Sequence, residues 1–433
     1  MLYSQFNSIL SYKNNYILHN AFTNKFMYLN PLLKELIEAA KNEDNLEGLR
    51  EIHPDFYQQL VELGFFVKQS DNEIEKVRQR IDEVNYNEEE YYLIINSTMN
   101  CNFGCWYCYE THKKNSHISD ASLQKIKKFI ENTLEKNKKI TKYTIQFFGG
   151  EPLLDYKKSV LPIMDYAFKK AQQRGIILLL NFTTNGYLIS DDMIQDFLKY
   201  KVNGFQITLD GNRDEHDKVR FVSKTKGSYD KIVENIKKIV RNKMSVVLRI
   251  NYTEKNLKEL DLVFEDLEDL ELEYRSLITF SLNKVWQESN NNLGEKVSTF
   301  LSLATNKGFS LPDALLSDRV ENSCYADKFN QATINYDGNV YKCNARDFTD
   351  ENKEGILNDE GVVEWNEKRT FRMEHKLKNK ACLECRILPI CGGGCSQNMI
   401  EHVDKDYCVN DFDEAKKDDI ILSMFLSENV EKI

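Results

Sequence analysis

The chain has 433 residues, and its 58 basic and 68 acidic side chains give a net charge of −10. This length allows two or three domains, and the acidic balance predicts no nucleic acid among the partners. No apolar run approaches the ~18 residues of a membrane-spanning helix, and the first residues lack a signal-peptide pattern, so we expect a cytoplasmic protein with no membrane partner.

Residues 1–75 are predicted to form a small separate module. Short apolar strands alternate there with amphipathic helices, and a polar turn between the first two strands is typical of a hairpin. Together they indicate a winged-helix-like unit, and the charge-dense residues 76–90 indicate a linker helix. The predicted elements of the module are strands at 16–20, 26–29 and 65–67 and helices at 31–40 and 54–64.

Residues 91–305 show a regular alternation of apolar strands and longer amphipathic stretches. Six strand–helix units in a row favour a parallel sheet wrapped by helices, two units short of a complete eight-stranded barrel. The predicted strands are 92–96, 143–148, 176–182, 204–209, 245–251 and 277–282. The predicted helices are 119–136, 158–174, 190–200, 228–242, 257–269 and 295–305.

Three cysteines follow the first of these strands in a CxxxCxxC pattern, at Cys101, Cys105 and Cys108. A structural zinc takes four protein ligands, and a four-iron cluster takes one cysteine per iron, so the triplet is one ligand short of either. The shortage favours an iron that is open to a substrate or cofactor. The alternative is that the three cysteines are ordinary partly buried residues.

Polar residues stand where the next strands are predicted to end. Gly149, Gly150 and Glu151 follow the second strand; paired glycines let a backbone approach a ligand closely, and a carboxylate can receive an ammonium group. In a barrel the carboxyl ends of the strands surround the ligand, although each of these segments by itself also fits a simple turn. Further candidates at such ends are Thr184, Thr208, Arg220, Arg249 and Asn251.

The triplet, the Gly-Gly-Glu-Pro segment one unit later, and the Asp-Gly followed by His-Asp-x-x-Arg at 210–220 resemble motifs of the radical S-adenosylmethionine (SAM) enzymes, in particular of their peptide- and protein-modifying branch. The resemblance implies an α/β fold with a partial (β/α)6 TIM-like barrel, and a [4Fe–4S] cluster on the triplet whose open iron chelates SAM. It implies SAM contacts for Tyr107 near adenine, for Gly149, Gly150 and Glu151 around the amino group, and for Thr208 and Arg220. Thr184 and Asn251 are further candidates at the mouth.

The other seven cysteines all lie between residues 324 and 408, and their spacing resembles the SPASM domain, which carries two auxiliary iron–sulfur clusters. We therefore expect this C-terminal Cys-rich domain over residues 306–433. The resemblance implies that Cys324, Cys343 and Cys395 serve the first auxiliary cluster, and that Cys382, Cys385, Cys391 and Cys408 serve the second. A structural zinc site remains the alternative, because Cys382-x2-Cys385 also fits a zinc knuckle.

Ten cysteines then divide into three, three and four, which leaves the first auxiliary cluster without a fourth cysteine. Its remaining iron is expected to be open, or to be held by another residue type or by a substrate thiolate. Sulfatase-maturing members of the family carry an additional cysteine in this region and an aspartate after the position of Cys343. Here Asn344 follows, and no cysteine lies between Cys324 and Cys343, which counts against a sulfatase maturase.

The resemblance implies a radical SAM maturase that removes a hydrogen from a ribosomal precursor peptide and installs an intramolecular cross-link, either a thioether or a carbon–carbon or carbon–oxygen bond. In that setting the N-terminal module is expected to be a leader-peptide recognition element that binds by strand addition, or else an oligomerisation or packing module. An electron donor such as flavodoxin or ferredoxin is expected. The alternatives are radical oxidation of a protein substrate or a small molecule, and a non-catalytic metal-binding scaffold.

Overall fold

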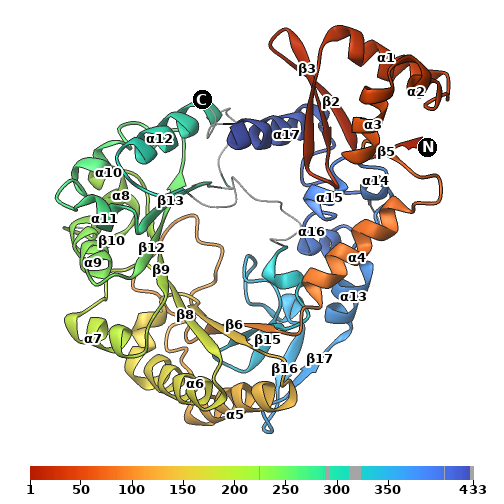
Figure 1. The fold of residues 1–433 in the computed structure, drawn as a ribbon. Coiled ribbons are helices and arrows are strands. Elements are labelled where there is room, and N and C mark those ends of the chain that lie inside the picture. Colours follow the sequence, from red (N-terminus) through yellow and green to blue (C-terminus); the bar gives the residue numbers. More distant parts are fainter. Residues whose placement is uncertain (224, 286, 288–292, 312–322, 404, 430–433) are drawn as a thin grey trace. The chain divides into compact units, whose positions relative to one another are not determined.

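The computed structural model describes residues 1–223, 225–285, 287, 293–311, 323–403 and 405–429. The chain forms two compact units (Figure 1). One contains residues 1–87, the described part of 313–329, and 370–429; the other contains 88–311 and 330–369. These units group the chain differently from the boundaries 1–75, 76–90, 91–305 and 306–433, which stay predictions.

The second unit is built on one large sheet, in the order β13-β12-β9-β8-β7-β6-β14-β15-β16-β17. Six neighbouring strands follow chain order and are all parallel, so the predicted partial barrel is confirmed. These strands are β6 (Glu90–Asn96), β7 (Lys142–Phe148), β8 (Ile177–Thr184), β9 (Gly204–Leu209), β12 (Ser245–Tyr252) and β13 (Ile278–Lys284). A seventh parallel strand, β14 (Gln331–Asn335), pairs with the other edge of β6 and was not predicted.

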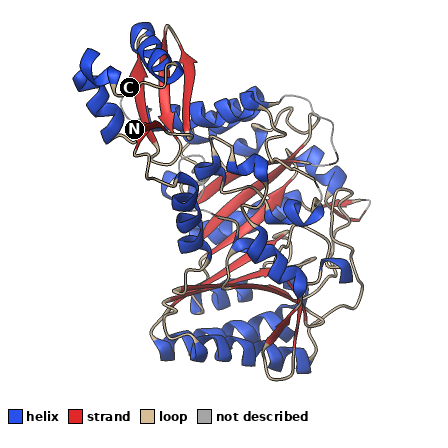
Figure 2. Ribbon diagram, turned by 90° about the vertical axis from the view of Figure 1, so that its right-hand side faces the viewer, coloured by secondary structure: helices blue, strands red, loops and turns tan. Residues whose placement is uncertain are grey.

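Helices lie along the outer side of this sheet (Figures 1 and 2). Most of the predicted ones are confirmed; Ser119 and Ser190 cap two of them by accepting a hydrogen bond from the backbone N–H three residues later. The helices and turns of this region are α5 (Asp120–Lys136), η1 (Pro152–Asp155), η2 (Tyr156–Val160), α6 (Leu161–Arg174), α7 (Asp191–Lys199), α8 (Arg213–Val219), α9 (Tyr229–Arg241), α10 (Leu262–Glu265), α11 (Leu272–Arg275) and α12 (Gly294–Asn306). A small hairpin joins β10 (Phe221–Ser223) and β11 (Lys226–Gly227).

The helix predicted at 257–269 is wrong, since only α10 is helical there and turns flank it. Its acidic residues fall at a spacing of four, as Asp261, Glu265 and Asp269 do, and like charges at that spacing repel on a helix. Glu259 also takes the left-handed conformation, with φ of 56°. The apolar side chains Leu260, Val263, Phe264, Leu267 and Leu270 are nevertheless buried, so the segment covers the sheet as a series of turns.

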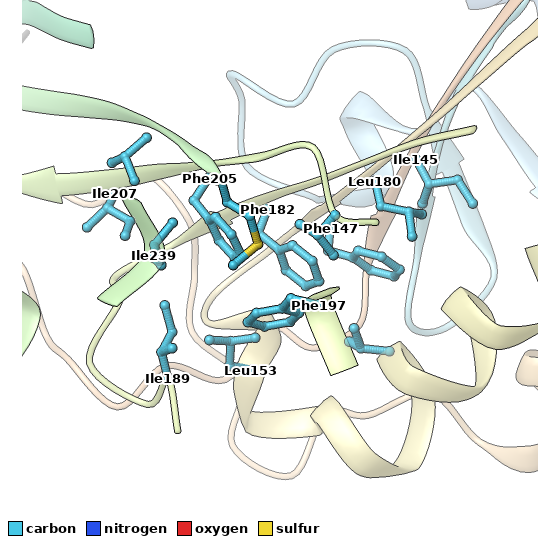
Figure 3. Packing of buried hydrophobic residues seen from close by; sticks show 14 of the residues in the cluster. Ile145, Phe147, Leu153, Leu180, Phe182, Ile189, Phe197, Phe205, Ile207 and Ile239 are labelled. Atoms are coloured by element: carbon cyan, nitrogen blue, oxygen red, sulfur yellow. The ribbon is translucent and has the colours of Figure 1, made fainter. Parts of the chain in front are cut away.

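Alternation along the strands separates the core from the barrel interior. Phe147, Phe182 and Phe205, from three neighbouring strands, stack at centroid distances of 4.9 and 5.4 Å and pack against Phe197 of α7 (Figure 3). Successive side chains of a strand point to opposite faces, so on each strand the residue next to the aromatic faces the interior of the barrel. Those interior positions carry polar side chains such as Gln206.

In the other unit, residues 1–87 fold into a three-stranded antiparallel sheet and several helices. The predicted hairpin is confirmed, but β2 pairs with its first strand and was missed. The strand predicted at 65–67 pairs with the first residues of the chain rather than with the hairpin. The elements are β1 (Leu2–Tyr3), β2 (Asn7–Tyr12), β3 (Asn15–Asn20), β4 (Lys25–Leu29), α1 (Pro31–Asn42), α2 (Gly48–Ile52), α3 (Pro54–Glu62), β5 (Phe66–Val67) and α4 (Glu73–Asn85).

The linker helix predicted at 76–90 is observed as α4, which begins earlier because Asn72 caps it through Glu75 N. The Cys-rich region consists of short elements, as expected, and Gly338, with φ of 85°, makes the predicted hairpin turn after β14. Its elements are η4 (Tyr325–Asp327), β15 (Asn339–Tyr341), η5 (Asp350–Asn352), β16 (Gly355–Leu357), β17 (Val363–Trp365), α13 (Glu367–His375), α14 (Lys380–Leu383), α15 (Leu388–Cys391), α16 (Ser396–Glu401) and α17 (Glu414–Asn429). Within the described part of the chain, no helix has the length and apolar character needed to cross a bilayer.

Candidate active site

The loop that carries Cys101, Cys105 and Cys108 connects β6 to α5 and is closed at its base. Met99 N donates to Ser116 Oγ at 2.9 Å, and Lys113 N donates to Met99 O at 3.0 Å. These bonds fix both ends of the loop, so the cysteines occupy a defined position after the first barrel strand.

The predicted glycine pair lies directly against this loop. Gly150 N donates to Thr98 O at 3.0 Å, and Glu151 N donates to Asn100 O at 2.8 Å. A Cβ on Gly150 would stand 2.3 Å from Asn100 O, and one on Gly149 would stand 2.5 Å from Thr98 O. The glycines are therefore required by the close approach of the backbone of the cysteine loop, whatever else they contact.

One cavity in the barrel unit brings most of the predicted residues together. The three cysteines line it, and so do Gly149 and Gly150 and the inward side chains of five strands. The predicted residues that line it are Cys101, Cys105, Tyr107, Cys108, Gly149, Gly150, Thr184, Thr208, Arg220, Arg249 and Asn251. It is also lined by Tyr109, Glu110, His112, Phe148, Thr183, Asn185, Gln206, Lys284, Val285 and Gln287.

Some of these additional residues could have been found from the sequence. Gln206 lies two positions before Thr208 on one strand and so shares its face. No sequence pattern indicated that Glu110 and His112 line the cavity, because they lie on an irregular loop.

Glu151 is the predicted contact that does not line the cavity. Its side chain is fully buried, and its carboxylate accepts hydrogen bonds from Leu153 N at 3.0 Å, Thr184 Oγ1 at 2.7 Å and Asn185 N at 2.8 Å. Burial raises the pKa of Glu151, although these bonds act in the opposite direction. The carboxylate thus joins the ends of β7 and β8 behind the glycine pair, and a direct contact of Glu151 with SAM stays a prediction.

Tyr107, Arg220 and Asn251 form one network with Asp210 on the cavity wall. Tyr107 Oη donates to Asp210 Oδ2 at 2.6 Å and accepts from Arg220 Nη2 at 2.7 Å. Arg220 Nε also pairs with Asp210 Oδ2 at 2.9 Å, and Asn251 Nδ2 donates to Tyr107 Oη at 3.2 Å. Asp210 is 1% exposed, so its charge is balanced inside the protein by Arg220.

The His-Asp-x-x-Arg segment holds Arg220 in this place. His216 Nδ1 accepts from Asp210 N at 3.2 Å, and its Nε2 lies 3.0 Å from Ser228 Oγ, which in turn donates to Arg220 O at 2.7 Å. Burial lowers the pKa of His216 well below its usual value, so the ring is neutral. Asp217 accepts from Ser228 N at 2.8 Å. His216 and Asp217 therefore position the arginine and do not line the cavity.

The environment of the triplet fits iron ligation. Burial raises the pKa of Cys101 to about 12 and that of Cys108 to about 11, and it also raises the pKa of Cys105. A buried thiolate needs positive charge next to it, and a metal centre supplies that charge. Among the described residues, no group of three or more Cys, His, Asp or Glu side chains is arranged so that it could hold a single metal ion. A four-iron cluster places a different requirement on the chain, since each iron takes its own cysteine.

A second cavity, in the other unit, is lined by all four cysteines predicted for the second auxiliary cluster, Cys382, Cys385, Cys391 and Cys408. They come from α14, the turn between α14 and α15, the end of α15 and the segment before α17. Asn379 Nδ2 donates to Cys382 Sγ at 3.3 Å, and burial raises the pKa of Cys382 to about 12. This donor set also fits a cluster with one cysteine per iron.

The three cysteines predicted for the first auxiliary cluster lie in different parts of the chain. Cys343 follows β15 in the barrel unit, whereas Cys324 precedes η4 and Cys395 precedes α16 in the other unit. Their joint role stays a prediction. Within the barrel unit, Tyr109 Oη donates to Asn344 O at 2.7 Å and Thr111 N donates to Asp347 Oδ1 at 2.9 Å, so the segment after Cys343 is attached to the cysteine loop.

The Radical SAM superfamily model matches residues 95–267, which contain the triplet, the glycine pair and the network around Tyr107. This chain carries a radical SAM domain. The family uses SAM and a [4Fe–4S] cluster, and the ten cysteines of this chain fit a SPASM-type C-terminal domain.

Among curated proteins, this chain is 27% identical over 380 residues to the cysteine-type anaerobic sulfatase-maturating enzyme of Clostridium novyi (strain NT), covering 79% of this chain and 95% of that protein. It is 29% identical over 196 residues to the radical SAM cyclopropyl synthase TigE of Paramaledivibacter caminithermalis, which covers 41% of this chain and 40% of TigE.

Two solved structures share the fold. Native anSMEcpe with bound AdoMet and the Cp18Cys peptide matches with a TM-score of 0.59 at 17% identity, over 79% of this chain and 99% of that one. Streptococcus suis SuiB bound to precursor peptide SuiA matches with a TM-score of 0.53 at 17% identity, over 94% of this chain and 98% of SuiB.

Proposed function

We propose that this enzyme matures a ribosomally made precursor peptide by installing an intramolecular cross-link. The observation that carries the proposal is the cavity in which the three cysteines of the loop meet the ends of the barrel strands. It offers cysteines for a cluster and, beside them, polar groups for SAM. The fold likeness to SuiB, a protein solved with a precursor peptide, extends over 94% of this chain and so over most of residues 1–87.

The N-terminal sheet supports a peptide as the substrate. Its order is β2-β3-β4, so the two outer strands each have one unpaired edge within the sheet. An extended leader peptide adds to such an edge through backbone hydrogen bonds, with its alternate side chains in contact with the protein. The bound leader would then tether the core of the peptide to the enzyme and so raise the local concentration of the core at the active site.

SAM bound at the open iron would, when reduced, supply a 5'-deoxyadenosyl radical able to take a hydrogen atom from an unactivated carbon. The chain's own residues hold the reactants for that step. Cys101, Cys105 and Cys108 would bind the cluster, and Gly149 and Gly150 leave the space beside it open. Tyr107 is fixed by Asp210 and Arg220, so its ring can face adenine without rotating away. Thr184, Thr208 and Asn251 are proposed as further hydrogen-bonding partners of SAM.

Closing the cross-link removes a second hydrogen from the peptide as a proton and an electron. The proposed acceptor of the electron is an auxiliary cluster, held by Cys324, Cys343 and Cys395 or by the four cysteines of the second cavity. If the first of these has an open iron, a substrate cysteine can bind there and lead to a thioether. If another residue closes it, a carbon–carbon or carbon–oxygen link is favoured. A flavodoxin or ferredoxin is the proposed source of the electron that starts the reaction.

Oxidation of a protein substrate is the second candidate, favoured by the 27% identity to the Clostridium novyi enzyme. Against it stands Asn344, whose amide cannot accept a proton as the carboxylate of sulfatase maturases does.

Coexpression with a short open reading frame beside the gene tests the proposal. The expected result is a precursor peptide that has lost two hydrogen atoms per link. A variant with Cys101, Cys105 and Cys108 changed to Ala should leave its mass unchanged. If the enzyme instead converts a cysteine in a sulfatase peptide to an aldehyde and leaves the neighbouring peptide intact, the second candidate replaces the first.

A further inference from the structure

A buried lysine stands in the second cysteine cavity with no role in the function proposed above. Lys417 lies on the first turn of α17 and is 7% exposed, whereas the preceding Lys416 is exposed and pairs with Asp411 at the surface. Lysine is rarely buried without a partner, because its ammonium group loses its hydration. The buried ammonium group of Lys417 therefore requires a source of negative charge next to it.

The ammonium group has two such neighbours. Nζ donates to Glu414 Oε1 at 2.5 Å, and Lys417 lines the cavity together with Cys382, Cys385, Cys391 and Cys408. The lysine is thus a fixed positive charge beside a cysteine of the set.

Glu414 does not cancel this charge by itself. Its other oxygen accepts from Arg386 Nε at 2.9 Å, so the carboxylate is shared between two cations. Glu414 is also largely exposed, where water weakens its field, while Lys417 is enclosed with the thiol groups. The positive charge of Lys417 consequently dominates inside the cavity.

We propose that Lys417 raises the reduction potential of the cluster held by Cys382, Cys385, Cys391 and Cys408. The inference rests on the proposed assignment of that cluster. Reduction adds one electron, and so one negative charge, to a centre that already carries four thiolates. A neighbouring cation stabilises the reduced form more than the oxidised form, and the charge and hydrogen bonds around the sulfurs are what set the potential of such clusters. Lys417 would make this site a better acceptor for the electron that ring closure releases.

The test is a potentiometric titration of the full-length protein, followed by electron paramagnetic resonance. Using the variant without Cys101, Cys105 and Cys108 as the background removes the signal of the SAM cluster. We expect Lys417→Met to lower the potential of one remaining cluster and Lys417→Arg to keep it near the parent value. Lys416→Met, the same change one residue earlier on the surface, is the matched control and should leave the potential unchanged.

A second variant covers the case in which Lys417→Met loses iron. Glu414→Gln leaves the cavity intact but removes the competing negative charge, and it should raise the potential of the same cluster. Equal potentials in Lys417→Met, Glu414→Gln and the parent would overturn the inference, as would iron content showing that the four cysteines hold no cluster. The titration contains no peptide, so its result does not depend on peptide modification. A shifted potential in the titration, together with an unmodified peptide in the coexpression experiment, would contradict the proposed function alone.

Discussion

Replacing Gly150 with alanine tests whether the glycine pair is needed for the packing of the cysteine loop. The new Cβ would stand 2.3 Å from Asn100 O and 2.7 Å from Asn100 C. Ordinary van der Waals contact begins near 3.4 Å, so the backbone at Asn100 would have to move by about 1 Å. Both atoms belong to the main chain and have no alternative rotamer.

The expected loss of stability follows from two contributions. Forcing an additional carbon into a packed interior costs about 1–3 kcal/mol. Moving Asn100 also weakens the hydrogen bond from Glu151 N and the neighbouring bond from Gly150 N to Thr98 O, at about 1 kcal/mol each. Together these effects destabilise the protein by roughly 3–5 kcal/mol, and they displace the loop that carries Cys101.

Gly104 provides the control, because it lies in the same loop and a Cβ there would have no atom of the described residues within 4 Å, its two chain neighbours aside. The assay compares Gly150→Ala and Gly104→Ala by denaturant unfolding of the metal-free chains and by iron and sulfide content after reconstitution. Gly150→Ala should lower the free energy of unfolding and lose about four iron atoms per chain, as one cluster contains, while Gly104→Ala should resemble the parent. Equal behaviour of the two variants would refute the reasoning.

Three other changes have defined outcomes. Arg220→Met leaves the buried carboxylate of Asp210 without its cation and should cost about 3–5 kcal/mol in denaturant unfolding; a loss below 1 kcal/mol would contradict the buried ion pair. Changing Cys382 and Cys408 to Ala should lower the iron content by about four atoms per chain and leave the SAM cluster signal intact, whereas unchanged iron would argue for another ligand set. Burial lowers the pKa of His19 from 6.5 to about 4, so the unfolded chain binds a proton first and stability should fall as the pH drops from 6.5 to 4, by up to about 3 kcal/mol. Amide exchange of β3 measures this loss, and His19→Gln should abolish it; equal pH dependence in both proteins would be inconsistent with a buried neutral ring.

The barrel was predictable because its information is local. Each strand is a short apolar run, and strand follows helix in chain order, so period and order suffice to place Cys101 after β6 and Gly149 after β7. Thr208 and Asn251 were predicted at the ends of two further strands, and both line the cavity.

What could not be predicted depends on contacts between distant segments. Strand β14 joins β6 across more than 230 residues, and nothing in residues 331–335 indicates that partner. The glycine pair was noticed, but the neighbour that requires it, the backbone of the cysteine loop, is visible only in three dimensions. Asp210 likewise gave no sign that it would bind Tyr107 and Arg220 together. The prediction of a helix at 257–269 was wrong because it used the apolar periodicity alone. It did not take into account the repulsion between acidic residues spaced four apart.

The proposed function requires that the hydrogen atom gained by 5'-deoxyadenosine come from a carbon atom of the peptide. A precursor peptide synthesised with deuterium on its carbon atoms is incubated with the reduced enzyme and SAM. The mass of the 5'-deoxyadenosine produced is then measured by mass spectrometry. The account predicts that the deuterium of the peptide appears in 5'-deoxyadenosine in step with the formation of the cross-link. Unlabelled 5'-deoxyadenosine, formed while the peptide keeps all its deuterium, would contradict it.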